Sequence, residues 1–198
     1  MAYKRQISLK DLHVGKLTPG TDVVGGTPAY TNITSIKGAI SASSSVNQSE
    51  ESYYSDDAVE EVHVAVNSMT FEVEISNLSI EERALLLGQR TTGGMAVGNK
   101  DDIAPEVWVG FRSKRTDGTY RYVSLPKCKF SVPAESYATE AESTTAQTIT
   151  LTCNALPLIS NGNYKITLDE GSSLTATQQT AKNNWFTTPV IALVDDEE

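Results

Sequence analysis

Few side chains in this sequence have the types and spacing that catalysis requires. Nucleophilic hydrolysis needs a Ser or Cys beside a His that a carboxylate orients. The chain has only two histidines, His13 and His63, and neither lies near a nucleophile-elbow motif. His13 falls in a polar N-terminal segment, and His63 lies on the acidic side of an alternating stretch. The sequence therefore predicts no catalytic residue, no cofactor and no enzyme.

Metal-ligand patterns are equally sparse. Glu61 and His63 project from the same side of a predicted strand, and Asp56 and Asp57 lie just upstream. A complete site needs convergent third and fourth ligands, which this spacing does not supply. A solvated polar face explains these residues better, so we expect no metal site.

Length, charge and cysteine content set the next limits. The 198 residues suit a single domain, residues 1–198, and 25 acidic against 16 basic residues give a net charge of −9. No apolar run approaches the roughly 18 residues of a spanning helix, and we expect no secretory signal and no membrane insertion. Cys128 and Cys153 are too few for a disulfide scaffold, so a reduced, buried pair is expected.

The acidic balance bears on nucleic acids. Tight phosphate binding draws on clustered Lys and Arg, which a chain of net charge −9 does not favour. The same balance is compatible with a protein past which DNA slides without being held.

Period-two alternation in the first half of the chain indicates strands. We expect an opening strand within residues 30–40, then a long exposed loop from Ser41 to Asp57, where serines and acids dominate. Residues 59–76 predict a hairpin that turns at Asn67-Ser68. One face of this hairpin is apolar and the other carries Glu61, His63, Glu72 and Glu74.

One helix and a second hairpin follow. Ser79 and Glu82 form a capping-box pattern and Gly88 a stop, which predicts a helix over about 79–87. Residues 88–98 are rich in glycine but lack the Gly-Lys-Ser/Thr sequence that ends a phosphate-binding loop, so they are expected to be a plain loop. The Asp117-Gly118 turn predicts a hairpin with a basic tip, whose cations are Arg112, Lys114 and Arg115.

The rest of the chain extends this pattern. Strands are expected at residues 146–156, 164–168 and 188–194, whereas residues 172–184 and the acidic tail 195–198 are expected to be solvated. The fold class is therefore mainly β: a β-sandwich or half-barrel with one short helix, long loops and a flexible loop at 41–57.

Several segments of the chain together resemble one family. They are Ile7 to Leu12, Gly26-Thr27-Pro28, Tyr53 to Asp57, Phe71 to Ile75, Leu78 to Gly88, Ala104 to Arg115, Asp117-Gly118, Tyr120-Arg121-Tyr122 and Lys127 to Phe130. In content and order they resemble the major tail tube proteins of phages with long, non-contractile tails (the siphovirus type). Pro126 departs from that pattern and indicates a bulge or an edge position.

The resemblance implies a structural subunit that forms six-membered rings, which stack into a hollow tube for genome ejection. It implies a place in the virion tail after synthesis in the host bacterial cytoplasm. The implied partners are further copies of the chain, tape-measure, tail-tip and tail-terminator proteins, and double-stranded DNA that passes without specific binding.

Two sets of residues are candidates for these contacts. Glu72 and Glu74, with Glu61 as a weaker choice, are expected to face the lumen, because their neighbours across the pleat are apolar; an exterior position that serves only solubility is the alternative. The inter-subunit or inter-ring candidates are Tyr53, Tyr54, Asp56, Asp57, Arg112, Lys114 and Arg115. The basic tip is expected to meet acids such as residues 195–198, in contacts that salt weakens.

Two other functions remain open at this point. A secretion-system tube subunit shares the ring of six, and a ligand-binding β-sandwich module shares the fold class. The module is disfavoured because only 7% of residues are aromatic and Trp108 and Trp185 are far apart in the sequence.

Overall fold

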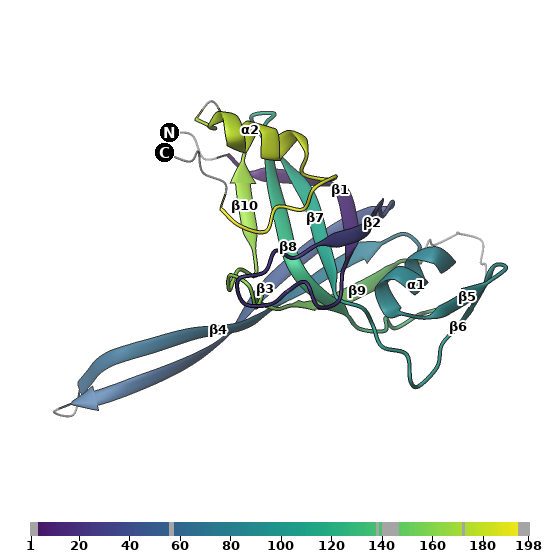
Figure 1. Ribbon diagram of the computed structural model, residues 1–198, viewed down its shortest axis with the longest axis horizontal. Coiled ribbons are helices and arrows are strands. Elements are labelled where there is room, and N and C mark those ends of the chain that lie inside the picture. Colours follow the sequence, from purple (N-terminus) through teal and green to yellow (C-terminus); the bar gives the residue numbers. More distant parts are fainter. Residues whose placement is uncertain (1–3, 56–57, 138, 140–146, 172, 194–198) are drawn as a thin grey trace.

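Antiparallel strands dominate the computed structural model, which describes residues 4–55, 58–137, 139, 147–171 and 173–193 (Figure 1). The elements are β1 (Gln6–Leu17), β2 (Tyr30–Ser35), β3 (Ala39–Ser55), β4 (Ala58–Ile75), α1 (Ile80–Leu87), β5 (Arg90–Thr92), β6 (Met95–Val97), β7 (Val107–Arg115), β8 (Tyr120–Phe130), β9 (Ile149–Ala155), β10 (Ile166–Asp169) and α2 (Ala176–Asn183). The predicted mainly-β class with a short helix is confirmed.

One large sheet has the strand order β2-β1-β7-β8-β9-β4-β3, and β5 and β6 form a separate pair. β7 pairs with one edge of β8, while β10 pairs with residues 121–124 of β8 and β9 with residues 128–130. The register of β7 and β8 gains one residue between Leu125 and Cys128. Pro126 therefore lies at a bulge, as its position in the sequence indicated.

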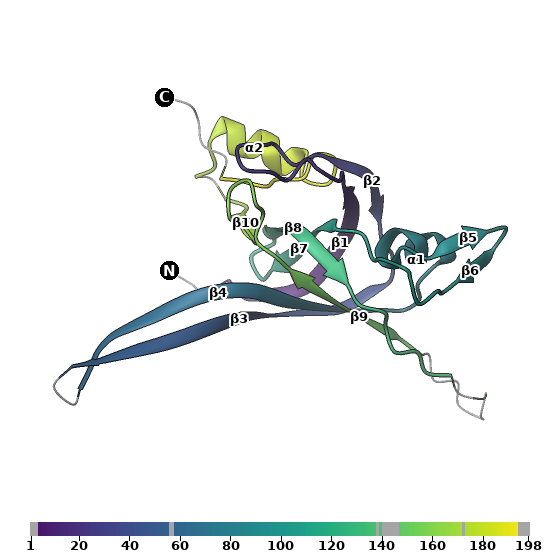
Figure 2. The same cartoon turned by 60° about the horizontal axis from the view of Figure 1, so that its bottom comes forward.

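The most prominent feature is a long ribbon made by β3 and β4, which projects away from the body in both views (Figures 1 and 2). β9 pairs with β4 only from Met69 to Ile75. Beyond Met69 the two strands continue alone, and we call this part, residues 47–55 and 58–68, the arm. It forms a strand pair instead of the expected loop at 41–57, because almost every residue of β3 has a partner on β4.

The predicted turn at Asn67-Ser68 is also wrong. β4 runs through these residues as one strand, and Asn67 is an extra residue between the pairs Asn47–Ser68 and Gln48–Val66. A bulge of this kind shifts the side-chain alternation by one residue. The alternation of side chains does shift by one residue at Asn67, but the shift is caused by the bulge and not by a turn.

The main core lies between the curved parts of the large sheet. It gathers buried side chains from β1, β4, β7, β8, β9 and α1, among them Val14, Phe71, Val109, Leu125 and Leu151. α1 is placed as predicted: Ser79 and Glu82 form the capping box, and Gly88 ends the helix in the left-handed conformation with φ 71°. Leu86 and Leu87 of the helix are buried in this core.

A second cluster covers the opposite face of β7 and β8. Trp185 is fully buried and packs against Tyr122, with ring centroids 5.6 Å apart. Trp108 Nε1 donates a hydrogen bond to Ser124 Oγ (2.7 Å), which in turn donates to the carbonyl of Val190 (2.6 Å). The segment from α2 to residue 193 thus holds the outer face of the sheet closed.

Four sequence predictions need correction in these regions. Residues 176–183 form α2, with a capping box made by Thr175 and Gln178, where a solvated segment was expected. Residues 188–193 form no strand, because they cover the Trp108 cluster. The N-terminal segment around His13 is strand β1, and the glycine-rich residues 88–98 contain the β5–β6 hairpin.

The segment from α2 to residue 193, which we call the C-terminal cover, is expected to stabilise the subunit through Trp185. Trp185→Ala should lower the free energy of unfolding by about 3–5 kcal/mol, because it empties a fully buried position. Tyr54→Ala, at a side chain that is 72% exposed, should change it by less than about 0.5 kcal/mol. Urea unfolding of the free subunit measures both, and equal losses would contradict this account of the fold.

Candidate assembly surfaces

One face of the β9-β4-β3 layer is polar and solvent-facing. Glu72 pairs across the strands with Ser43 and Thr152, while Phe71 and Val73 on the opposite face enter the core. Glu74 accepts hydrogen bonds from Ser41 Oγ (3.1 Å) and Thr148 Oγ1 (2.7 Å). The predicted lumen candidates Glu72 and Glu74 therefore lie on a surface of hydroxyl and carboxylate groups.

Glu61 lies on this same face, although it is on the arm. Its cross-strand partner is Tyr53, and Glu72 has the partner Ser43, so both acids oppose odd-numbered residues of β3. Cross-strand partners share a face of the sheet. The Asn67 bulge brings Glu61 into line with Glu72 and Glu74, and the structure thus places all three lumen candidates on one face.

The other face of the arm carries an exposed row of valines on β4. We call it the valine face; it consists of Val62, Val64 and Val66 with their partners Ser52, Glu50 and Gln48. The three valines are 40–49% exposed and continue the line of buried residues Met69 and Phe71. A row of exposed apolar side chains of this kind is a candidate surface for contact with another molecule.

The outer edge of β3 is a second candidate contact surface. β3 ends the strand order, so the outer side of its 17 residues has no hydrogen-bonded strand in the part of the chain that the structure describes, although β1 lies near residues 40–44. Natural proteins protect such edges with charged side chains, Lys above all, with Pro or with short strands; β3 contains no Lys or Pro, and its only charged residues are Glu50 and Glu51. A long unprotected edge is typical of strands that pair with another chain.

Charge is concentrated on the same hairpin. The sequence from residue 39 to 75 contains eight acidic residues and no basic one: Glu50, Glu51, Asp56, Asp57, Glu60, Glu61, Glu72 and Glu74. The hairpin therefore carries −8 of the net −9, and the remainder of the chain is nearly neutral at −1. Sequence composition alone could have shown this asymmetry, but only the structure shows that Glu50, Glu51, Glu60 and Glu61 lie on the projecting arm.

The arm contains two of the predicted contact residues. Tyr53 and Tyr54 lie near its end, are 52% and 72% exposed, and point to opposite faces because they are consecutive in a strand. Asp56 and Asp57 fall outside the described residues. Both tyrosines are thus accessible to a partner, one from the polar face and one from the valine face.

The predicted basic tip of the β7–β8 hairpin is largely paired within the subunit. Arg112 Nε pairs with Asp11 and lies over the ring of Tyr120, 4.4 Å from its centroid. Arg115 is buried and pairs with Asp169. Lys114 is the one cation of the three without an ion pair to a described residue. The expected acidic partner, residues 195–198, lies outside the described part of the chain.

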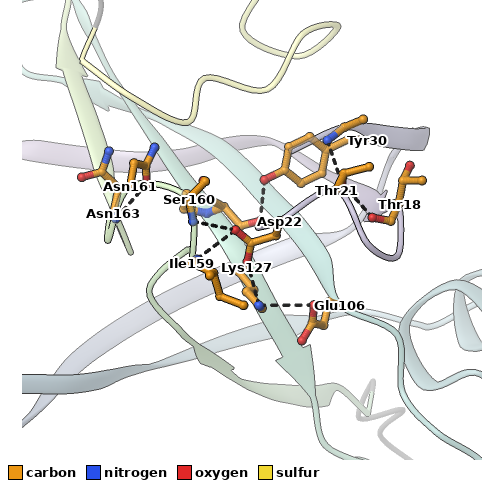
Figure 3. A network of polar contacts seen from close by, with 12 residues as sticks. Thr18, Thr21, Asp22, Tyr30, Glu106, Lys127, Ile159, Ser160, Asn161 and Asn163 are labelled. Carbon is orange, nitrogen blue, oxygen red and sulfur yellow. Dashed lines mark hydrogen bonds and ion pairs between the residues drawn. The ribbon is translucent and has the colours of Figure 1, made fainter. Parts of the chain in front are cut away.

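A buried polar network, which the sequence did not indicate, fixes three segments against one another (Figure 3). Lys127 Nζ donates to Asp22 Oδ2 (2.8 Å), and the backbone N–H groups of Ile159 and Ser160 donate to Asp22 Oδ1 (2.9 and 3.0 Å). Tyr30 Oη donates to the carbonyl of Pro126 (2.9 Å). The loop after β1, the bulge of β8 and the loop after β9 are joined by these bonds.

The network also sets the ionisation of its members. Burial pushes the pKa of the Asp22 carboxyl upward, but the hydrogen bonds from Lys127, Ile159 and Ser160 outweigh burial and hold that pKa below its usual value. Burial raises the pKa of Tyr30, so its phenol stays protonated and donates. Asp22 and Lys127 are therefore a charged pair, satisfied on both sides.

The two cysteines and the two histidines lie in different surroundings. Cys128 and Cys153 are free and fully buried, and burial raises the pKa of the Cys128 thiol. His13 stacks on Phe186, with ring centroids 4.5 Å apart, and His63 is exposed on the arm opposite Glu51. Within the described ranges, no three His, Cys, Asp or Glu residues come together as metal ligands would. No helix there has the length and apolar character to cross a membrane.

The comparison with protein families agrees with this architecture. A family model described as "Phage tail tube protein" matches residues 13–185 of the 198, so the chain belongs to the phage tail tube protein family. A search of curated proteins gives no match. Family membership confirms the resemblance to phage tail tube proteins and makes the chain a structural component of the virion tail.

The Asp22 network leads to a prediction about how the stability of the subunit depends on pH. Asp22→Asn should lower the free energy of unfolding by about 3 kcal/mol at pH 7, because it leaves the buried Lys127 cation without its counter-charge. Since the folded-state pKa of Asp22 is lowered, the carboxylate stabilises the fold above its ordinary pKa of about 3.9, and this stabilisation is lost as pH falls below that value. The difference in the free energy of unfolding between the wild type and the variant should therefore become smaller toward pH 3.

Urea unfolding at pH 7 and pH 3 measures this difference. The matched control is Asp11→Asn, which breaks the partly exposed pair with Arg112 and should cost less than about 1 kcal/mol. A difference that is independent of pH, or equal to that of the control, would show that Asp22 is not the anchor of the network.

Proposed function

We propose that this chain is the repeating subunit of a hollow phage tail tube, in which rings of six copies stack and DNA passes along the bore. The observation that carries the proposal is the β3–β4 ribbon, whose long free edge and exposed valine face have no use in an isolated subunit. Repeated head-to-tail contacts produce closed rings and open stacks. Membership of the tail tube family supports the same assembly.

In this proposal the edge of β3 pairs with a neighbouring copy in the ring. The layers β9-β4-β3 of successive copies then form one continuous wall. Edge pairing would satisfy the backbone groups that β3 leaves open and remove an aggregation hazard. The arm, with Tyr53 and Tyr54, reaches an adjacent subunit or ring.

The polar face of this layer is the proposed lumen surface. Glu72, Glu74 and Glu61 lie on it together, among the hydroxyl groups of β3 and β9. Attractive contacts repeated along a tube would add up over many phosphates and hold the duplex, whereas a like-charged wall keeps it mobile. The chain performs no chemistry in this function.

The other parts of the proposal concern the surroundings of the tube. The resemblance supports the long, non-contractile tail type, synthesis in the host bacterial cytoplasm, and partnership with tape-measure, tail-tip and tail-terminator proteins.

Lys114 is the member of the basic tip best placed to contact another subunit, because it has no acid paired to it among the described residues. Arg112 and Arg115 instead form ion pairs within their own subunit.

Charge reversal tests the lumen assignment. The double variant Glu72→Lys and Glu74→Lys should assemble into tubes of normal length but slow or arrest genome ejection, because a positive wall attracts the phosphates. Glu72→Gln with Glu74→Gln is the neutral control and should eject at close to the wild-type rate. Ejection is followed by release of DNA from intact virions, and a normal rate for the Lys variant would place these acids elsewhere than the lumen.

Replacement of the arm tests its role in assembly. Because Asn47 and Ser68 are cross-strand partners, Gln48 to Asn67 can be exchanged for a two-residue Asn-Gly turn without cutting into the part of β3 that faces Phe71. The variant should remain a folded monomer and form no tubes. Electron microscopy checks assembly and circular dichroism checks folding; normal tubes from a folded variant would refute the role of the arm.

A further inference from the structure

A groove of about 440 Å³ opens where the arm joins the body. Its floor is formed by Phe71 and Phe111, whose rings stack with centroids 5.5 Å apart, and Ile7 lies at its mouth with 59% of its surface exposed. This is the open end of the main core, beyond which β3 and β4 leave the body. The volume is within the range of about 300–1,000 Å³ that pockets for small ligands occupy, which is room for a few side chains.

The charged residues that line this groove are both basic. Arg121 and Lys165 contribute to its wall, and no Asp or Glu is among the lining residues. Arg121 pairs with Asp169, at 2.6 Å, whereas Lys165 is exposed and has no ion pair within the described part of the chain. The groove therefore combines an apolar floor with an unneutralised cation.

The arm has the complementary combination. Its valine face presents Val62, Val64 and Val66, and Glu50 points to the same side because it is the cross-strand partner of Val64. Glu51 points to the opposite, polar face. The valine face thus carries one acid, Glu50, and the groove carries one cation without an ion pair to a described residue, Lys165. Their charges are complementary.

The arm cannot fill the groove of its own subunit. Phe71 of the groove floor and Val64 of the valine face belong to the same strand, β4, which runs outward without a turn between them. Both views show the arm projecting away from the body (Figures 1 and 2). The element that covers the groove must therefore come from another molecule.

We propose that the groove receives the arm of a second copy, with the valine side chains against Phe111 and Ile7 above the buried Phe71, and with Glu50 paired to Lys165. Apolar contact supplies the burial, and the ion pair selects the register and orientation. Residues 47–68 contain six acidic and no Lys or Arg residues, and this net charge of −6 favours the basic groove as the docking surface. This inference rests on the proposed tube function and specifies where the arm docks.

A charge swap in the full-length chain tests the docking. Lys165→Glu and Glu50→Lys, made separately, should each reduce the amount of sedimentable assembly by roughly tenfold or more, because each places like charges in contact. The double variant should restore assembly to within about twofold of the wild type. Glu51→Lys is the matched control; it makes the same change on the neighbouring residue and should leave assembly within about twofold, because it faces away from the groove.

Each outcome decides a separate question. Thermal unfolding of the free subunits should be unchanged in all four variants, because these side chains are exposed. If the wild type forms hollow tubes and the single variants assemble normally, or if the double variant fails to recover, the docking is wrong while the tube function stands. If the wild-type chain does not assemble even with tail-tip proteins present, both proposals are contradicted.

Discussion

The structure depends on the preservation of two distinct faces along a single pair of strands. β4 begins on the arm and ends in the core, and its apolar side chains must stay on one face over 18 residues. A strict period of two would move them to the wrong face after Val66, and the Asn67 bulge corrects the phase. As a result, the same face that closes the core inside the body becomes the valine face outside it.

This arrangement separates two properties that a tube subunit needs. The exposed valines of the arm lie on one face, together with Glu50, whereas Glu61, Glu72 and Glu74 lie on the other. The body itself is closed on both sides of β7 and β8, by the main core and by the C-terminal segment around Trp185. Rigidity of the body and reach of the arm are therefore provided by different parts of the chain.

Sequence reasoning predicted the elements whose signals are local. The capping box at Ser79, the Asp-Gly turn of the β7–β8 hairpin and the irregularity at Pro126 all depend on a few neighbouring residues. It also assigned the acids and valines of residues 61–75 to the correct faces. The class of mainly-β fold follows from these patterns, and the family match covers most of the chain.

The errors arose where structure depends on distant partners. Residues 41–55 have the composition of a loop, and they are a strand only because β4 pairs with them along their length. Likewise, Arg112 and Arg115 appeared as a free basic tip because their acidic partners, Asp11 and Asp169, lie far away in sequence. The Asp22–Lys127 pair joins residues 105 positions apart and leaves no local pattern.

The C-terminal cover has a consequence for how the subunit matures. Trp108 and Tyr122 belong to strands that a ribosome completes well before it reaches Trp185. Without that residue, the aromatic side chains on this face of β7 and β8 lack the ring that packs on Tyr122. A chain truncated before Trp185 would therefore expose an aromatic surface that the full-length subunit buries.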